Sequence, residues 1–145
     1  MSLFLIILVF VVAALLIVYL RAVIHGIYYY WRFVFRNKSL SEMVTEFNLS
    51  FQSFLPSFWK FIFVYVFRDA QINSITGNSN NHTILIKDMF YSSISNVIFQ
   101  DSRRTIIEID GKNIQGNLTD LTLGNMFILT TVDELHGLLS KLPIV

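Results

Sequence analysis

The chain opens with an uninterrupted apolar run, "LFLIILVFVVAALLIVYL", at positions 3 to 20. At about 1.5 Å of rise per residue this run makes a helix of roughly 27 Å, close to the roughly 30 Å hydrocarbon core of a bilayer. A cleaved signal peptide would carry basic residues before the run and small residues at a cleavage site after it. Only Met1 and Ser2 precede the run, and Arg21 follows it. The pattern therefore predicts a retained transmembrane helix.

Basic and aromatic residues follow the run and suggest both an orientation and an interface. Basic residues beside a span stay on the cytoplasmic or matrix side of the membrane, and here they all follow the run. We therefore expect the N-terminus outside, in a bacterial inner membrane or an organellar inner membrane. Tyrosine and tryptophan rings suit the headgroup layer. Residues 1–38 are expected to form an anchor whose membrane-interface residues are Arg21, Tyr28, Tyr29, Tyr30, Trp31, Arg32 and Arg36.

Residues 39–50 contain the signals of a short helix. Ser39 and Ser41 are candidate N-caps, and Glu42 follows Ser39 at the spacing of a capping box. Apolar side chains then recur every four residues, at Met43, Phe47 and Phe51. This spacing predicts a short amphipathic helix along the membrane surface or against the next segment.

The next segment, "FLPSFWKFIFVYVF" at 54–67, admits three interpretations. It could be a second span, although residues 55–67 fall short of the roughly 20 that a bilayer requires. It could be a strand, or a helix packed against the anchor. We expect it not to span, which keeps residues 69–145 on the side of the basic flank. As a strand it would place on one face the residues Trp59, Phe61, Phe63, Tyr65 and Phe67, of which the candidate contacts with a partner or with lipid are Trp59, Phe61 and Phe63.

Short alternating segments separated by turn signals predict an antiparallel sheet within residues 69–145. The segments 83–87 (TILIK) and 94–100 (ISNVIFQ) are expected to be strands. The polar tract 76–82 (TGNSNNH) is expected to be a loop tip, and 101–104 (DSRR) a turn.

The pair Asp110-Gly111 is the clearest hairpin signal, because a type I′ turn needs a positive φ at both central residues. This turn pairs residue 109 with 112, 108 with 113 and 107 with 114. The same construction at Gly124-Asn125, joined to the first through Gly116-Asn117, predicts a four-strand meander with one apolar face.

A final helix is expected to cover that apolar face. Thr131 and Glu134 have capping-box spacing, and Pro143 ends the segment. An apolar stripe follows the helical period at Val132, Leu135, Leu138, Leu139 and Leu142. The predicted class is α+β: a transmembrane helix, then an antiparallel meander domain closed by a C-terminal helix. A series of strands closed by a helix, over roughly residues 58–142, resembles the plan of pleckstrin-homology-like domains. With a phospholipid as ligand, Arg103 and Arg104 would be the contact, with Lys87 as a further candidate.

Composition supports the membrane assignment and argues against several functions. Hydrophobic residues make up 54% of the chain and charged residues 14%, whereas soluble chains carry about 25% charged residues. A net charge of +1 gives no reason to expect nucleic acid, and the absence of cysteine excludes disulfides and thiolate metal sites. His25, His82 and His136 have no metal-ligand spacing. We expect no catalytic residue, no metal and no cofactor.

The sequence thus predicts a non-catalytic, membrane-anchored interaction module, an accessory or assembly subunit of a larger membrane protein complex. Its partners would be membrane lipid and other membrane-protein subunits, with no nucleic acid. Two alternatives stay open: an immunity or exclusion-type inhibitor of the membrane, and a phospholipid-binding module of the pleckstrin-homology-like plan.

Overall fold

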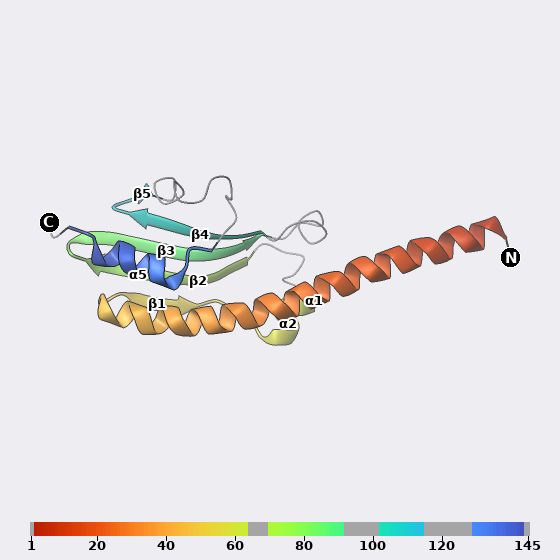
Figure 1. The fold of residues 1–145 in the computed structure, drawn as a ribbon, viewed down its shortest axis with the longest axis horizontal. Helices are drawn as coiled ribbons and strands as arrows, with labels where there is room; N and C mark the ends of the chain where they lie inside the picture. Colours follow the sequence, from red (N-terminus) through yellow and green to blue (C-terminus); the bar gives the residue numbers. More distant parts are fainter. Residues whose placement is uncertain (1, 64–69, 92–101, 115–128, 144–145) are drawn as a thin grey trace.

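The computed structural model describes residues 2–63, 70–91, 102–114 and 129–143. It combines a long N-terminal helix, a five-stranded antiparallel meander and a short C-terminal helix (Figure 1). The strands are hydrogen-bonded in sequence order, from β1 to β5. The elements are α1 (Leu3–Glu46), β1 (Ser50–Ser53), α2 (Phe58–Phe63), β2 (Ala70–Ser79), β3 (His82–Tyr91), β4 (Ser102–Ile109), β5 (Lys112–Asn113) and α5 (Val132–Ser140).

α1 is one continuous helix of 44 residues, about 66 Å long at 1.5 Å per residue. Its first part is exposed and extends beyond the sheet, whereas its second part lies against the sheet (Figure 1). The buried side of the second part follows the helical period. These buried positions are Ala22, Gly26, Tyr29, Phe33, Asn37, Leu40, Met43 and Val44.

The separate helix expected from residue 39 is therefore wrong, and the expected boundary at residue 38 falls inside α1. Ser39 and Ser41 lie within α1 rather than at the start of a helix. The Ser41 hydroxyl donates a hydrogen bond to the Lys38 carbonyl at 2.7 Å. The buried stripe runs in phase from Phe33 through Leu40 to Met43, so packing against the sheet keeps the helix intact. A capping signal is worth about 1 kcal/mol, less than the packing that overrides it.

The β2–β3 hairpin is longer than its sequence suggested. The strand expected at 83–87 is confirmed within β3, but the loop expected at 76–82 is mostly strand. Only Asn80 and Asn81 form the turn, with φ angles of 51° and 65°. Asparagine tolerates this left-handed region, so two residues suffice where the polar composition suggested a longer loop.

The Asp110-Gly111 hairpin is confirmed. Asp110 has φ 52° and Gly111 has φ 76°, and residue 109 pairs with 112 and 108 with 113. The amide of Ile114 also donates to the carbonyl of Ile107 at 3.0 Å. The turn expected at 101–104 is wrong for 102–104, because these residues already pair with β3. The strand expected at 94–100 and the turns at Gly116-Asn117 and Gly124-Asn125 lie outside the described residues.

α2 occupies part of the segment that admitted three interpretations. Residues 58–63 form a helix packed on α1, so the strand interpretation is wrong for them. Phe58, Phe61 and Ile62 follow helical spacing and turn toward Tyr30 and Phe33 of α1. Residues 64–67 lie outside the described residues.

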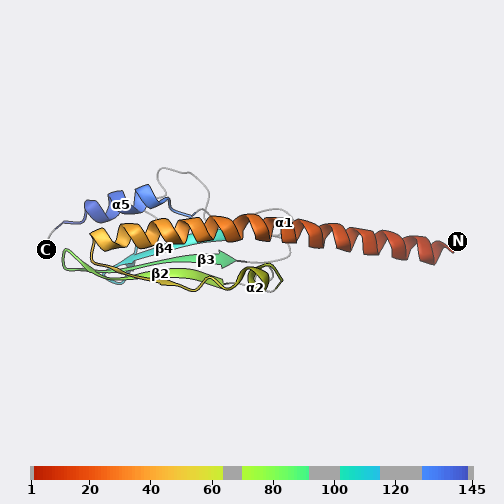
Figure 2. The same ribbon diagram turned by 90° about the horizontal axis from the view of Figure 1, so that it is seen from below.

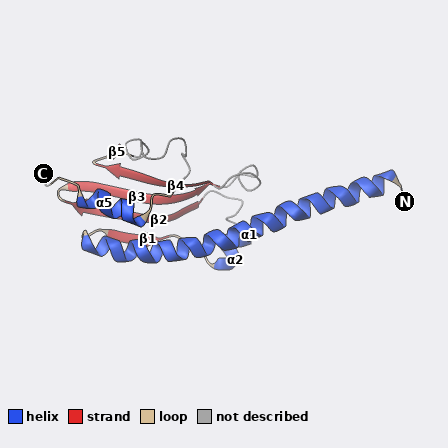
Figure 3. Ribbon diagram, in the orientation of Figure 1, coloured by secondary structure: helices blue, strands red, loops and turns tan. Residues whose placement is uncertain are grey.

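α5 closes the domain as the sequence predicted. Thr131 and Glu134 form the expected capping box, and Leu135 and Leu139 are buried. α1 and α5 both lie on the same face of the sheet, with the sheet as the second layer (Figures 2 and 3). The sequence predicted that α5 covers this face. It did not predict that α1 covers the face as well.

Among the described residues, the core consists of two apolar clusters along α1. The proximal cluster lies nearer the exposed part of α1 and contains Tyr29, Phe33, Phe61, Ile62, Ala70, Ile72, Phe90 and Leu129. The distal cluster contains Leu40, Met43, Val44, Leu49, Ile75, Ile84, Ile86, Ile107, Leu135 and Leu139.

Candidate functional site

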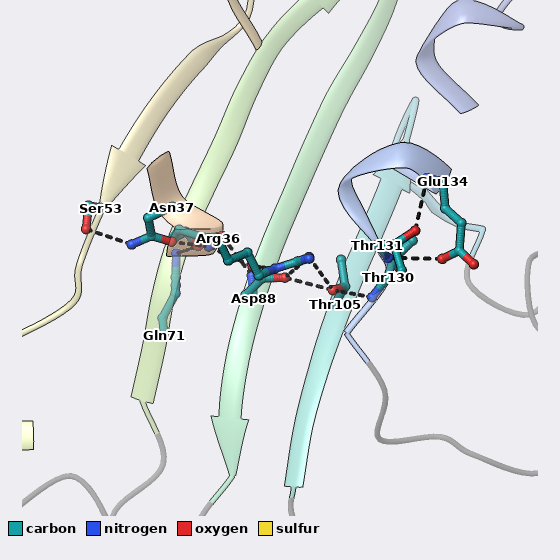
Figure 4. Close-up of polar contacts among 10 residues, drawn as sticks. Arg36, Asn37, Ser53, Gln71, Asp88, Thr105, Thr130, Thr131 and Glu134 are labelled. Atoms are coloured by element: carbon teal, nitrogen blue, oxygen red, sulfur yellow. Dashed lines mark hydrogen bonds and ion pairs between the residues drawn. The ribbon is translucent and has the colours of Figure 1, made fainter. Parts of the chain in front are cut away.

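A buried ion pair joins α1 to the middle of the sheet. Arg36 of α1 donates from Nε to Oδ2 of Asp88 at 2.7 Å and from Nη2 to Oδ1 at 3.0 Å (Figure 4). Asp88 lies on β3 and is fully buried, and the Arg36 side chain is 10% exposed. This two-point geometry matches the planar guanidinium to the planar carboxylate, which fixes orientation as well as distance.

The Asp88 carboxylate is saturated with donors. Thr105 of β4 donates to Oδ1 at 2.7 Å, and Asn73 of β2 donates to Oδ2 at 2.7 Å. Together with the two bonds from Arg36, each oxygen accepts two hydrogen bonds. Because both oxygens of this carboxylate are occupied by protein donors, it fits a structural role better than proton transfer.

Further polar contacts extend from this pair across the sheet. Asn73 also donates to Asn37 of α1 at 2.8 Å, and Asn37 donates to Ser53 of β1 at 3.0 Å. The amide of Thr130, just before α5, donates to the Thr105 hydroxyl at 3.0 Å. One network therefore links α1, four strands and the segment that leads into α5. We call the nearly buried Arg36 and the buried residues Asn37, Asn73, Asp88 and Thr105 the polar layer.

The polar layer separates the two apolar clusters. On β3, Asp88 lies between Ile86 of the distal cluster and Phe90 of the proximal cluster. On α1, Arg36 and Asn37 come between Phe33 and Leu40. An apolar surface alone tolerates a slide of one helical turn, but such a slide would leave Asp88 buried and unpaired. The polar layer therefore fixes the register of α1 on the sheet.

The exposed part of α1 is the second candidate site. In the part of the chain that the structure describes, α1 is the single helix long and apolar enough to cross a membrane, and none of its most apolar 18-residue window is buried. A long apolar surface without covering protein requires lipid or another apolar partner. By length and composition this segment is compatible with a membrane anchor or with a signal sequence.

The structure distributes the expected interface residues over different environments. Arg21, Tyr28, Trp31 and Arg32 are exposed, and Arg32 donates to the Tyr28 hydroxyl at 3.4 Å. By contrast, Tyr29 is buried in the proximal cluster, Tyr30 packs edge-on against Phe58, and Arg36 belongs to the polar layer. The helical period explains the division, because only one side of α1 faces away from the sheet.

The expected partner contacts divide in the same way. Trp59 and Phe63 are exposed, and their rings stack with centroids 5.9 Å apart and planes 7° apart. Phe61 is fully buried in the proximal cluster, so its ring is not part of the exposed surface. Arg103 and Arg104 lie in β4, paired with Phe90 and Met89 of β3.

A histidine connects the distal turns to the C-terminal segment. His82 Nδ1 lies 2.7 Å from Oδ2 of Asp110, and Nε2 lies 3.0 Å from the Pro143 carbonyl oxygen. Both neighbours are acceptors, so both ring nitrogens donate only when the imidazole is protonated. The hydrogen bond to Asp110 raises the pKa of His82, and the same bond lowers the pKa of Asp110, assisted by the Thr83 amide. Asn80 adds a bond to the Leu142 carbonyl at 3.0 Å.

The remaining polar groups form no concentrated reactive centre within the described residues. Nowhere among them do three or more histidine or acidic side chains meet to hold a metal ion. His136 is paired with Glu46 at 2.8 Å on the surface. A shallow hollow of about 310 Å³ lies nearby, between the end of α1, the β2–β3 turn and α5. Its lining residues include Glu46, Asn78 and Ser140.

Comparison with known proteins assigns no family: no family model, no curated protein and no solved structure matches the chain.

Proposed function

We propose that this chain is a membrane-anchored, non-catalytic interaction module, an accessory or assembly subunit of a larger membrane protein complex. One observation supports this most directly: the exposed apolar segment and the helix packed in the domain core are the same continuous α1. An anchor joined by a flexible linker would only tether the domain. A continuous helix fixed by Arg36 and Asp88 also holds the domain at a set distance and orientation.

The polar chemistry of the described residues agrees with a holding role. The buried carboxylate of Asp88 is occupied by donors on both oxygens, and the polar layer lies between two apolar clusters. Acid–base or nucleophilic catalysis needs a reactive group that a substrate can reach. The polar layer instead uses its groups to join α1 to the sheet.

The orientation proposed is N-terminus outside, with the domain on the cytoplasmic or matrix side of a bacterial or organellar inner membrane. The first acidic residue of the chain is Glu42, whereas Arg21, Arg32 and Lys38 all follow the apolar run within 18 residues of its end. Basic residues at this distance resist translocation and determine which side of the membrane a flank occupies.

The lack of cysteine allows a direct test of anchoring and orientation. Ser2→Cys and Lys141→Cys each introduce one thiol, at opposite ends of the molecule, for a membrane-impermeant maleimide. In intact cells or organelles we expect labelling of Ser2→Cys, and labelling of Lys141→Cys only after lysis. Intact mass should show the whole apolar run, and alkaline carbonate should leave the protein in the pellet. A mature chain without residues 3–20 would identify a signal sequence and refute the anchor.

The partner is tested by purification in mild detergent after chemical crosslinking. An accessory subunit should copurify with a second membrane protein at fixed stoichiometry. A lone chain whose expression protects cells from a toxin or a competing membrane machine would favour the immunity or exclusion alternative instead.

A further inference from the structure

The apolar outer side of α1 continues far beyond the predicted span. From Leu20 onward this side presents an apolar side chain every three or four residues, and each has half or more of its surface exposed: Leu20, Ile24, Tyr28, Trp31 and Phe35. The next positions on the same side are polar, Lys38 and Glu42. The apolar side therefore ends at Phe35, about 22 Å past Leu20 at 1.5 Å per residue.

α2 widens this apolar surface beside α1. The Trp31 ring lies 6.4 Å from Phe58, which lies 5.3 Å from Trp59, which stacks on Phe63. Trp59 is 67% exposed and Phe63 is 52% exposed. The exposed rings of the two helices thus form one surface, which we call the aromatic face: Tyr28, Trp31, Phe35, Trp59 and Phe63.

An upright helix would leave part of the aromatic face in water. The distance from Leu3 to Phe35 along α1 is about 48 Å. The hydrocarbon core and one headgroup layer together span about 37 Å. The end of the aromatic face would therefore stand roughly 11 Å outside the bilayer. A tilt of about 40°, at the upper end of the tilts that membrane helices adopt, shortens the 48 Å to 37 Å. It also places Arg21 about 21 Å across the roughly 30 Å hydrocarbon core, so its long side chain has to extend along the helix toward the headgroups.

The charges around the aromatic face match an anionic membrane surface. The described segments 3–41 and 47–63 contain Arg21, Arg32, Arg36, Lys38 and Lys60 and no acidic residue. Arg32 and Lys38 are exposed beside the aromatic rings, whereas Arg36 is paired with Asp88. Tryptophan and tyrosine together with basic side chains are the composition of an interfacial surface, and anionic lipid attracts the basic residues.

We propose that the aromatic face lies in the headgroup layer of the membrane that α1 enters, so that α1 leaves the bilayer strongly tilted and the domain rests on the lipid surface. This rests on the proposed membrane anchoring and adds a defined lipid contact to it. The sheet packs on the opposite side of α1, so a tilt toward the aromatic face leaves the sheet directed away from the lipid.

Both tryptophans of the chain belong to the aromatic face, so their fluorescence tests the proposal directly. The full-length protein is reconstituted in vesicles of phosphatidylcholine and phosphatidylglycerol, with bromine on the acyl chains near the headgroup or near the bilayer centre. Trp59→Phe isolates Trp31, and Trp31→Phe isolates Trp59. We expect both to be quenched more by bromine near the headgroup than by bromine near the centre, and to be protected from aqueous acrylamide.

Two further reporters, placed in the chain without Trp31 and Trp59, separate this proposal from the anchoring itself. Phe10→Trp should be quenched by bromine near the bilayer centre, and Thr45→Trp should respond to acrylamide alone. If Phe10→Trp is quenched while Trp31 and Trp59 respond to acrylamide, the anchor stands and the tilted arrangement is refuted. If Phe10→Trp is not quenched, the anchoring fails. If Trp31 and Trp59 are shielded from both quenchers, protein covers the face and the lipid contact is refuted.

The attraction between the basic side chains and anionic lipid is tested separately. Arg32→Gln removes an exposed positive charge without touching the polar layer, and it should shift the ratio of docked to undocked protein about fivefold toward the undocked state. Vesicles of phosphatidylcholine alone, which carry no anionic lipid, should also shift the protein toward the undocked state. Quenching by headgroup bromine that is unchanged in both experiments would overturn the role of anionic lipid.

Discussion

Replacement of Arg36 by methionine should destabilise the domain strongly, although methionine suits a helix. Arg36→Met leaves the Asp88 carboxylate fully buried with two of its four donors, Thr105 and Asn73. Removing one partner of a buried pair costs about 3–5 kcal/mol, because the other charge stays desolvated. For a domain of this size the melting temperature should fall by roughly 12–20 °C.

The assay is thermal unfolding of the full-length protein in mild detergent, followed by tryptophan emission, since Trp31 and Trp59 border the proximal cluster. Arg32→Met is the matched control: it removes an exposed arginine one turn earlier in α1 and should change stability by less than about 0.5 kcal/mol.

A double-mutant cycle separates the interaction free energy of the Arg36–Asp88 pair from the cost of losing each side chain. Asp88→Asn should also be costly, because Arg36 then keeps its charge with little access to water. Arg36→Met combined with Asp88→Asn should cost less than the two single changes added, with a coupling of about 2–3 kcal/mol. Equal stability of Arg36→Met and Arg32→Met, or strictly additive single changes, would refute the assignment of the polar layer.

Three other predictions concern the core, the continuity of α1 and the distal contacts. Phe33→Ala should cost about 3–5 kcal/mol, whereas Phe35→Ala on the exposed side should cost almost nothing in detergent; similar melting temperatures would contradict the assigned faces of α1. Ser39→Pro should cost about 3 kcal/mol and Ser39→Ala should be neutral, as measured by urea unfolding; a tolerated proline would mean that the helix breaks there. The His82–Asp110 pair should contribute most between about pH 4 and 6.5. Its contribution is lost as the pH rises through the raised pKa of His82 or falls through the lowered pKa of Asp110. The melting temperature of the protein minus that of Asp110→Asn should therefore peak in this window, and a flat difference across pH would exclude the pair.

The strongest local signals predicted the parts of the fold that depend on local structure. The Asp110-Gly111 turn and the Thr131–Glu134 capping box were confirmed because each depends on residues close in sequence. The split of residues 1–50 into an anchor and a separate helix was wrong, because a capping signal at Ser39 competes with a buried stripe that only the sheet creates.

The polar layer was missed because its members are far apart in sequence. Arg36 was counted with the basic flank of the span, and its partner Asp88 is 52 residues away. One signal pointed to it: Asp88 follows Ile84 and Ile86 at alternate positions of a strand, so it occupies an inward position where a charge requires a partner. That argument predicts a buried basic partner without identifying it. The inward position of Asn73 was even harder to predict from the sequence. β2 has an irregularity between Gln71 and Asn73 that breaks the simple alternation of inward and outward side chains.

Because α1 is one continuous helix, a rotation of its N-terminal part also moves the domain at its other end. From Leu20 to Glu46 the helix extends about 39 Å. If the polar layer moves with it, a change in tilt of about 10° within the bilayer displaces the far end of the domain by roughly 7 Å. Changes in bilayer thickness, or the sideways approach of another span, would therefore become a movement of the β2–β3 turn and the C-terminal segment at the far tip.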